Sequence, residues 1–278
     1  MRLTPSRWGT GPIPALLLHG FTGSRHSFDH LQPLLGDLLR ATCVDLPGHG
    51  RTALPRTSGT DGTDGAKGFL EIVEAIAGLL EEPGVLLGYS QGARLALAVA
   101  ARHPSRVRCL VLESVRPGLK RASERLERRK SDEALAKRLL RDGVPAFVDR
   151  WEQEPLFAGL RALPVEARVA LRARRTAHTA EGLAGALRCM GQGMQPDLWP
   201  WLPELRVPTL LLTGQRDRRY TGIARRMAAR LPRARQVSFS GTGHAPHLER
   251  PREYAAEVRA FLEDEWTLNR HLEEESRS

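Results

Sequence analysis

The chain has 278 residues, 41% of them hydrophobic, and carries 42 lysines and arginines against 32 acidic residues, a formal net charge of +10. No apolar run reaches the roughly 18 residues that a membrane span needs, and the first residues do not have the order of a secretory signal. The arginine excess comes without a helix-turn-helix, zinc-ligand or aromatic RNA-binding pattern, so solvated helix faces and a coding bias account for most of it. We therefore expect neither a nucleic-acid nor a membrane partner.

Cysteine usage points to a reducing compartment. The three cysteines are odd in number and lie far apart, at Cys43, Cys109 and Cys189. This pattern favours reduced thiols in a cytoplasmic protein over a disulfide framework or a metal site.

Short apolar runs alternate with helical patterns in the first half of the chain. The strand candidates end in turn-forming or polar residues and cover 15–20, 42–50, 85–90 and 109–114. The helical candidates between them cover 30–39, 69–82 and 91–103. Strands separated by helices predict βαβ units and a parallel sheet buried on both faces. Residues 54–68 are rich in Gly, Thr and Asp, which predicts a mobile loop.

The second half contains a helical insertion. Residues 117–200 show helical patterns separated by Pro and Gly, without a strand candidate, and strand candidates resume at 209–217 and 235–244. Helices are predicted around 222–231 and from Pro251 to about Trp266. We therefore divide the chain into an α/β core (1–116), a helical cap (117–200), the rest of the core (201–268) and a polar, frayed tail (269–278).

The sequence Gly88-Tyr89-Ser90-Gln91-Gly92 follows a strand candidate and opens a helix candidate. In a sharp strand-to-helix turn the backbone comes so close to its surroundings that only glycine fits, and the serine hydroxyl is raised at the edge of the sheet. A Gly-rich turn without catalytic function has the same local pattern. The partners of Ser90 decide between the two interpretations.

A nucleophilic or basic serine needs a histidine, and the histidine needs a carboxylate to orient it. Asp217 and His244 each come at the end of a later strand, in the chain order serine, acid, histidine. We predict these three residues as the catalytic triad. The rivals are Asp45, which precedes the serine and suits a structural turn, and His247.

An oxyanion hole requires two backbone donors. The N–H of Gln91, directly after the serine, would be one, and the N–H of Phe21, in the loop "HGFTGS", would be the other. His19 is expected to hold this loop by hydrogen bonding.

Together these residues resemble the α/β-hydrolase superfamily over nearly the whole chain outside the insertion. The fold implied is α/β, a mostly parallel sheet of about seven strands, shortened at its start, with flanking helices and an all-helical cap. Arg94 lies four residues after Ser90, on the same helical face, and would point beneath the cap. A guanidinium there suits an anionic substrate, because arginine pairs bidentately with carboxylates.

Several motifs resemble one branch of this superfamily, the SHCHC synthases (2-succinyl-6-hydroxy-2,4-cyclohexadiene-1-carboxylate synthases) of menaquinone biosynthesis. They include "GYSQGAR" at 88–94, "RLERRKSD" at 125–132, "WEQEPLF" at 151–157 and above all "GLAGALRCMGQGMQPDLW" at 182–199. The resemblance implies a lyase that eliminates pyruvate from SEPHCHC, a small polyanionic substrate with three carboxylates. No metal or organic cofactor is implied, and a monomer or weak homo-oligomer is expected.

The resemblance also implies site residues. Arg94, Arg128 and Arg175 would bind carboxylates, with Arg129 and Arg174 as the alternatives in the cap. Trp151 would cover the ring, Tyr89 would complete the polar wall, and Ser90 would act as a base without forming an acyl-enzyme.

The chain departs from the family pattern at three positions. Gln91 and Ala93 replace a hydrophobic residue and a glycine, and Lys120 is either a fourth substrate cation or a surface residue. Two other functions stay open on the same residues. One is a carboxylesterase or carbon–carbon bond hydrolase that forms an acyl-enzyme, and the other is a binding protein without catalytic activity.

Overall fold

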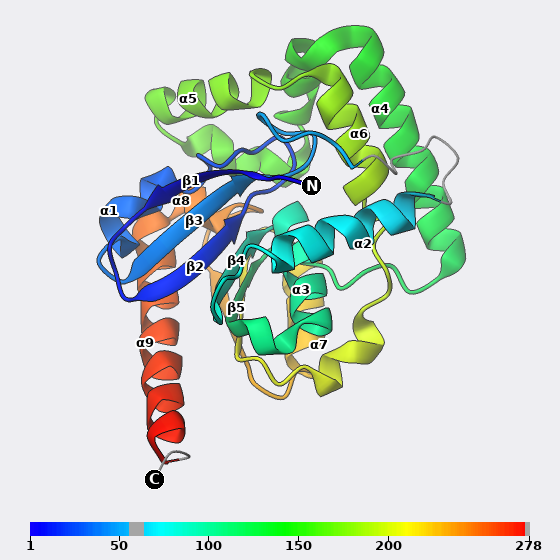
Figure 1. Ribbon diagram of the computed structural model, residues 1–278. Helices are drawn as coiled ribbons and strands as arrows, with labels where there is room; N and C mark the ends of the chain where they lie inside the picture. Colours follow the sequence, from blue (N-terminus) through cyan, green and yellow to red (C-terminus); the bar gives the residue numbers. More distant parts are fainter. Residues whose placement is uncertain (56–63, 276–278) are drawn as a thin grey trace.

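A single mixed sheet organises the computed structural model, which describes residues 1–55 and 64–275 (Figure 1). The strand order is β1-β3-β2-β4-β5-β6-β7. The strands are β1 (Thr4–Trp8), β2 (Ile13–Leu18), β3 (Leu39–Asp45), β4 (Gly84–Tyr89), β5 (Val107–Glu113), β6 (Thr209–Gly214) and β7 (Ala234–Phe239). The seven strands confirm the predicted sheet.

Every strand pairing is parallel except that of β1, which runs antiparallel to β3 at the edge of the sheet. The strand β1 is not predicted by the sequence pattern. Its residues, TPSRW, alternate between half-buried and exposed positions before the buried Trp8, and three of the five are polar or charged. The central strands β4 and β6 are buried along almost their whole length, and so they read as continuous apolar runs.

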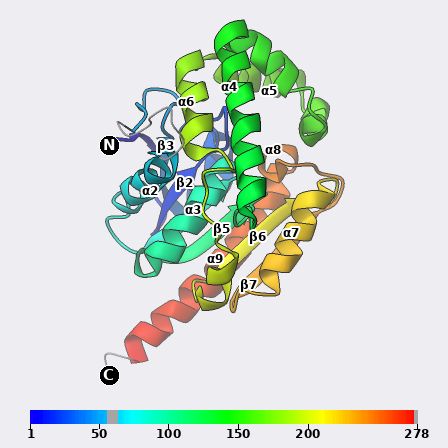
Figure 2. The same ribbon diagram turned by 90° about the vertical axis from the view of Figure 1, so that its right-hand side faces the viewer.

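Helices cover both faces of the sheet, as the βαβ pattern requires (Figures 1 and 2). One face carries α2 (Asp64–Ala77), α3 (Gln91–Arg102) and α7 (Arg218–Ala228), and its core includes Phe69, Leu97 and Met227. The other carries α1 (Gln32–Leu35), α8 (Pro246–Glu249) and α9 (Pro251–Glu275), and its core includes Leu35 and Tyr254. The single-turn helices η1 (Asp29–Leu31) and η2 (Pro104–Arg106) lie in connections.

The cap consists of α4 (Ala122–Trp151), η3 (Pro155–Ala162), α5 (Val165–Thr176) and α6 (Ala180–Met190), followed by η4 (Trp199–Glu204). Helix α4 is kinked at Gly143, whose φ of 77° is non-helical, and Pro145 follows two residues later. Helices α4 and α6 pack along each other around a small core of their own. Figure 2 shows this group of helices above the sheet. It covers the edge at which the parallel strands end.

Several predicted boundaries are wrong. The helix predicted over 30–39 is only η1 and α1, which end at Leu35, and Leu39 already begins β3. Helix α2 begins at Asp64, inside the predicted loop 54–68, because the apolar residues from Phe69 to Ile76 need a full helical face against the core. Residues 56–63 of that loop lie outside the described residues. Helix α9 continues to Glu275 and does not end near Trp266, since its polar C-terminal turns contain neither Pro nor Gly to stop it.

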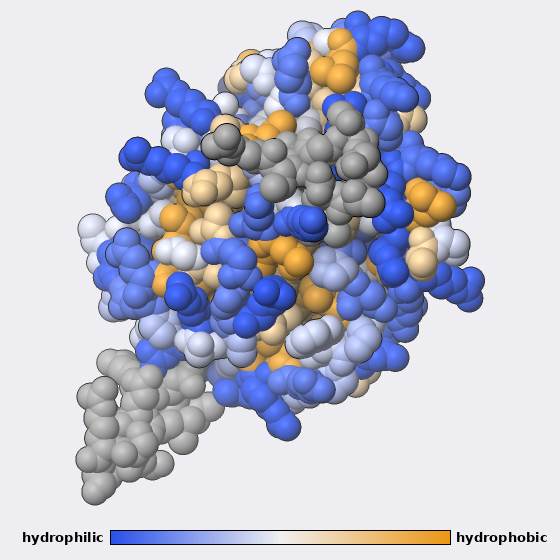
Figure 3. All heavy atoms as spheres, turned by 45° about the vertical axis from the view of Figure 1, so that its right-hand side comes forward, coloured by the Kyte–Doolittle hydropathy of each residue, from blue (hydrophilic) through white to orange (hydrophobic). Residues whose placement is uncertain are grey.

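The surface is predominantly hydrophilic on the face drawn in Figure 3, with apolar side chains in small separate patches. Among the described residues no helix is both long and apolar enough to span a membrane. The three cysteines are buried, and none of them forms a disulfide within the described residues.

Candidate active site

Ser90 occupies a strained turn between β4 and α3. Its φ of 50° and ψ of −102° lie outside the regions that side chains with a Cβ normally adopt. Gly92 permits this turn, because a Cβ there would collide with the backbone oxygens of Leu18 and His19. A Cβ at Gly88 would lie 2.6 Å from the backbone of Ala93. The two glycines of the motif therefore have the steric role that the sequence predicts for them.

Ser90, His244 and Asp217 form one hydrogen-bond chain. The Oγ of Ser90 lies 3.0 Å from Nε2 of His244, and Nδ1 of His244 lies 2.6 Å from Oδ2 of Asp217. His244 and Asp217 are buried, with 2% and 8% of their surface exposed. With Nδ1–H donating to the carboxylate, Nε2 is left as an acceptor for the serine proton.

The loops that carry the acid and the histidine are fixed by further bonds. Asp217 caps helix α7, and its Oδ1 accepts the N–H of Tyr220 at 3.2 Å. The Oγ of Ser114, at the end of β5, donates to the carbonyl oxygen of His244 at 2.8 Å. The N–H of Gly243 donates to the carboxylate of Glu249. The imidazole is thus held from its backbone as well as by the carboxylate.

Two unpaired amides lie near the serine. Within the described part of the chain, neither the N–H of Phe21 nor that of Gln91 donates a hydrogen bond. Gly20 brings the first loop close to the nucleophile, since a Cβ at Gly20 would be 3.5 Å from the Cβ of Ser90. The predicted pair of oxyanion donors is therefore available on both sides of the serine.

His19 holds this loop and takes no part in the triad. Its Nδ1–H donates to the carbonyl of Gly20 at 2.7 Å, and its Nε2 accepts the N–H of Leu46 at 3.0 Å. Burial lowers the pKa of His19 to about 4, so it is neutral at physiological pH.

His49 and His178 extend this arrangement. The Nε2 of His49 accepts the N–H of Thr22 at 3.2 Å, and the Nε2–H of His178 donates to the carbonyl of Thr22 at 3.1 Å. Burial lowers the pKa of both imidazoles. Because His178 lies between α5 and α6, this contact ties the cap to the oxyanion loop.

The rivals of the triad residues have other partners. Asp45 accepts hydrogen bonds from the backbone and the guanidinium of Arg25, which is a structural role in a turn. His247 faces Glu113, with 2.8 Å between Nδ1 and Oε1, and both are buried. Neither rival is hydrogen-bonded to Ser90.

The serine opens into a cavity of about 700 Å³ between core and cap. Arginines dominate the charged residues that line it among the described residues, with six of them against two carboxylates. These arginines are Arg94, Arg128, Arg138, Arg150, Arg175 and Arg219, and the carboxylates are Glu154 and Asp217. Since Asp217 is bound to His244, the cavity favours an anionic ligand.

Arg94 lies beneath the cap, as its position on α3 predicts. It is 6% exposed, and its Nη2 donates to the carbonyl of Met190 in α6 at 2.7 Å. Its Nη1 has no hydrogen-bond partner within the described residues. Burial lowers the pKa of this guanidinium to about 10, so it stays charged at physiological pH.

Arg128 and Arg175, and not their neighbours Arg129 and Arg174, line the cavity. Arg128 donates through Nε to Asp132 at 2.8 Å and through Nη1 to Gln192 at 3.1 Å. The side chains of these two partners come from α4 and from the turn after α6.

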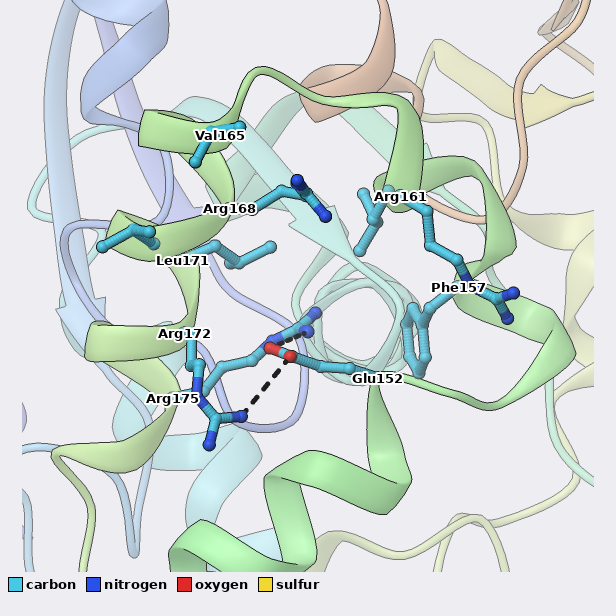
Figure 4. A pocket seen from close by; sticks show the side chains of 10 residues that line it. Glu152, Phe157, Arg161, Val165, Arg168, Leu171, Arg172 and Arg175 are labelled. Carbon is cyan, nitrogen blue, oxygen red and sulfur yellow. Dashed lines mark hydrogen bonds and ion pairs between the residues drawn. The ribbon is translucent and has the colours of Figure 1, made fainter.

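Arg175 stands between two cavities. A smaller one, of about 330 Å³, lies between α5 and η3, and Glu152, Phe157 and Arg175 form part of its wall (Figure 4). The Nη1 of Arg175 lies 3.0 Å from Oε1 of Glu152. Phe157 and Arg175 also line the larger cavity. A carboxylate in the larger cavity would compete with Glu152 for this guanidinium.

Aromatic side chains form the rest of the wall. Trp151 packs against Phe147, Phe157 and the predicted oxyanion residue Phe21. Tyr89 lies against His244, with 5.6 Å between ring centroids, and burial raises its pKa well above the ordinary value. Both line the cavity, as expected.

Of the residues that depart from the family pattern, Ala93 is buried in the core, and Lys120 and Gln91 have contacts at the surface and under the cap. Lys120 lies over the ring of Trp199 and lines a different pocket, so it is not a fourth cation of the large cavity. Gln91 is 3% exposed, and its Nε2 lies 3.5 Å from the carbonyl oxygen of Met190. Its side chain thus contacts the end of α6.

Several residues that line the cavity were not predicted from the sequence. Arg219 and Tyr220 stand in the first turn of α7, and Gln192 follows α6. The ring of Tyr220 lies 4.7 Å from that of His244, and its hydroxyl accepts a hydrogen bond from Gln192 at 3.0 Å. Arg219 and Tyr220 could have been predicted from their closeness in sequence to Asp217, because a helix that begins at Asp217 begins at the site.

Among the described residues, no cluster of His, Cys, Asp and Glu is arranged to hold a metal ion.

The chain is similar in sequence and in structure to known proteins. Residues 15–257 match the α/β hydrolase family. The chain is 39% identical to the putative 2-succinyl-6-hydroxy-2,4-cyclohexadiene-1-carboxylate synthase of Bacillus subtilis, over 88% of both chains. It is 33% identical to the synthase of that name from Escherichia coli, over 92% of this chain and 97% of the relative. The structure of MenH from S. aureus is similar, with a TM-score of 0.84 and 33% identity, over 94% of this chain and 98% of the other.

Proposed function

Because the chain belongs to the 2-succinyl-6-hydroxy-2,4-cyclohexadiene-1-carboxylate (SHCHC) synthase family of α/β hydrolases, we propose that it eliminates pyruvate from SEPHCHC in menaquinone biosynthesis. One observation carries the proposal. Ser90, hydrogen-bonded to His244, opens into a cavity in which arginines from the core and from the cap outnumber carboxylates. A neutral ester gains little from such a lining, whereas a substrate with several carboxylates is attracted by it.

The reaction uses Ser90 as a base. His244, oriented by Asp217, takes the Oγ proton, and the alkoxide abstracts the ring proton next to the succinyl carbonyl. The electrons of that C–H bond form the new double bond, and the C–O bond to the enolpyruvyl group breaks. The leaving group receives the proton from His244 and departs as pyruvate. Each proton removed from one group is therefore delivered to another, and no water is consumed.

The two amides next to Ser90 stabilise the charge of this step. As the ring proton leaves, negative charge develops on the succinyl carbonyl oxygen, and the N–H groups of Phe21 and Gln91 would bind it there. Trp151 and Tyr89 would pack against the ring.

The three arginines expected to bind carboxylates approach the cavity from different sides. Arg94 is on the core helix α3, whereas Arg128 and Arg175 are on the cap helices α4 and α5. This distribution suits a substrate whose carboxylates point in different directions. It also makes the cap part of the binding site, since neither α4 nor α5 belongs to the α/β core.

A coupled assay for pyruvate, run on enzymatically generated SEPHCHC, tests the proposal. The wild type should release pyruvate well above the spontaneous rate, and Ser90→Ala should reduce turnover about 10³-fold or more. Arg94→Ala should lower kcat/KM, whereas Arg102→Ala should not, because this exposed arginine of the same helix pairs with Glu74 on the surface. No pyruvate above the spontaneous rate from the wild type would contradict the assignment.

The same proteins distinguish the esterase alternative. An acyl-enzyme mechanism predicts a burst of nitrophenol from a p-nitrophenyl ester and covalent labelling of Ser90 during turnover. A base mechanism predicts weak ester hydrolysis without a burst. The cytoplasmic location, the absence of nucleic-acid and membrane partners, and a monomer or weak homo-oligomer stay predictions.

A further inference from the structure

We propose that Asp132 is a positioning residue, which fixes the orientation of Arg128 in the cavity and sets the local charge that a substrate carboxylate meets. This inference rests on the proposed function. It concerns a residue that does not itself line the cavity and lies behind Arg128.

Asp132 and Gln192 together restrict the guanidinium of Arg128. Asp132 Oδ1 accepts from Nε at 2.8 Å, and Gln192 Oε1 accepts from Nη1 at 3.1 Å. Gln192 is fixed in turn, because its Nε2 donates to the hydroxyl of Tyr220 at 3.0 Å. With Nε and Nη1 both engaged, the outer nitrogen, Nη2, is left to meet a ligand. A flexible arginine thereby becomes a cation of defined direction.

The burial of Asp132 supports a role beyond surface pairing. Its side chain is 6% exposed, whereas that of Arg128 is 36% exposed. Burial raises the pKa of its carboxyl, and the positive charges of Arg128 and Arg94 oppose that shift. A buried carboxylate is costly unless it is paired, and here its pairing partner lines the cavity. The carboxylate oxygen also contacts the turn at Gly191, where a Cβ would collide with it.

The charges of Arg94, Arg128 and Asp132, which form one corner of the site, predict that a second substitution restores part of the activity that a first one removes. Arg94 and Arg128 carry two positive charges, and Asp132 offsets one of them, which leaves the corner matched to one substrate carboxylate. If Arg128 is removed, the buried carboxylate of Asp132 stays without its partner and repels the substrate. Removing Asp132 as well should then improve the enzyme.

The test is a double-mutant cycle on the full chain, measured by pyruvate release. Asp132→Asn alone should lower kcat/KM about 10- to 100-fold, since the charge-assisted bond that holds Arg128 is lost. Arg128→Ala should lower it further. The double variant, Arg128→Ala with Asp132→Asn, should be several-fold more active than Arg128→Ala alone.

Glu133→Gln is the matched control. Glu133 is the next residue of α4 and pairs bidentately with Arg188, but neither residue lines the cavity. The Glu133→Gln substitution should therefore leave kcat/KM within about twofold of the wild type. Thermal unfolding of all variants separates lost stability from lost positioning, because a purely structural role would lower the melting temperature and give additive losses of activity.

Two results would overturn the role of Asp132. One is a double variant whose kcat/KM falls below that of Arg128→Ala by the factor that Asp132→Asn costs alone. The other is a Glu133→Gln variant that loses as much activity as Asp132→Asn. If the wild type releases no pyruvate, the proposed function itself fails. Calorimetric titration of the same variants with citrate, a tricarboxylate probe, then tests the double-mutant cycle without catalysis. The affinities of the variants for citrate should follow the order expected for kcat/KM, with the double variant above Arg128→Ala.

Discussion

Acid should destabilise this protein strongly, and the structure allows the magnitude to be worked out. His19 is buried and His30 is half-buried between packed elements, and burial lowers the pKa of each from 6.5 to about 4. For His30 the neighbouring His247 adds to the effect of burial. Burial also lowers the pKa of His49 well below its ordinary value, and the charges of His19 and His178 add to this. All three are therefore neutral in the folded protein at pH values where the unfolded chain is protonated.

The sign follows from which state binds the proton. Above pH 6.5 both states are neutral, and the full stability is present. As the pH falls through 6.5, the unfolded chain gains protons that the folded protein does not bind, so the free energy of unfolding decreases. The loss continues until the pH reaches the folded pKa, about 4 for His19 and His30.

One pKa unit corresponds to about 1.4 kcal/mol, so each of these two histidines removes between about 3 and 4 kcal/mol by pH 4. Together they remove about 7 kcal/mol, against a typical total stability of about 5–15 kcal/mol for a domain. His49 adds to this loss in the same direction. A large loss of stability between pH 6 and pH 4 is therefore expected. Carboxylates that are held by arginines lose their contribution only at lower pH, below about 4.5.

Urea denaturation at several pH values, followed by far-UV circular dichroism, measures the effect. The free energy of unfolding should fall with a slope of about 3–4 kcal/mol per pH unit between pH 6 and pH 4.5, the slope expected for two to three protons. His30→Gln keeps a side-chain donor for the carbonyl of His247 and removes one titrating group, so its slope should be smaller by about 1.4 kcal/mol per pH unit.

The control is His26→Gln, which replaces an exposed histidine paired with Asp29 and should leave the slope unchanged. A wild-type slope below that of a single proton would refute the reasoning, because it would mean that the buried imidazoles are protonated in the folded protein. An unchanged slope in His30→Gln would refute the assignment of one of these protons to His30.

Asp217→Asn should lower turnover about 10³-fold or more in the pyruvate assay, because the amide can donate to Nδ1 of the histidine and so favours the wrong tautomer; unchanged turnover would exclude the triad. Gly92→Ala should destabilise the protein by about 1–3 kcal/mol in urea denaturation, because its Cβ collides with two carbonyl oxygens. Gly222→Ala, in helix α7 with open space around it, should instead stabilise by about 0.5–1 kcal/mol, and equal effects at the two glycines would contradict the steric argument. Tyr220→Phe removes the hydrogen bond to Gln192 and should cost about 1 kcal/mol of stability in the same denaturation; no loss would show that this link between cap and core contributes nothing.

The sequence by itself determined the architecture of the core and predicted which serine, aspartate and histidine meet in one hydrogen-bond chain. Apolar runs such as 85–90 and 209–214 are buried on both sides in a parallel sheet, so their pattern depends mainly on local residue type. Parallel strands end at the same edge, and so Ser90, Asp217 and His244 could be assigned to one site from their positions after strands. The strand β1 escaped prediction because its pairing with β3 at the sheet edge, and not its composition, makes it a strand.

Only the tertiary structure decided how the cap completes the site. Arg128 and Arg129 are adjacent in sequence and chemically identical, and which of them faces the cavity depends on how α4 packs along α6. The same holds for Asp132 and Gln192, which are 60 positions apart along the chain and meet only at the guanidinium of Arg128. The lowered pKa values of the buried histidines also follow from packing, because burial is a property of the assembled molecule and not of a residue type. Local patterns specify which groups a chain possesses, whereas the packing of distant segments specifies which of those groups face a ligand.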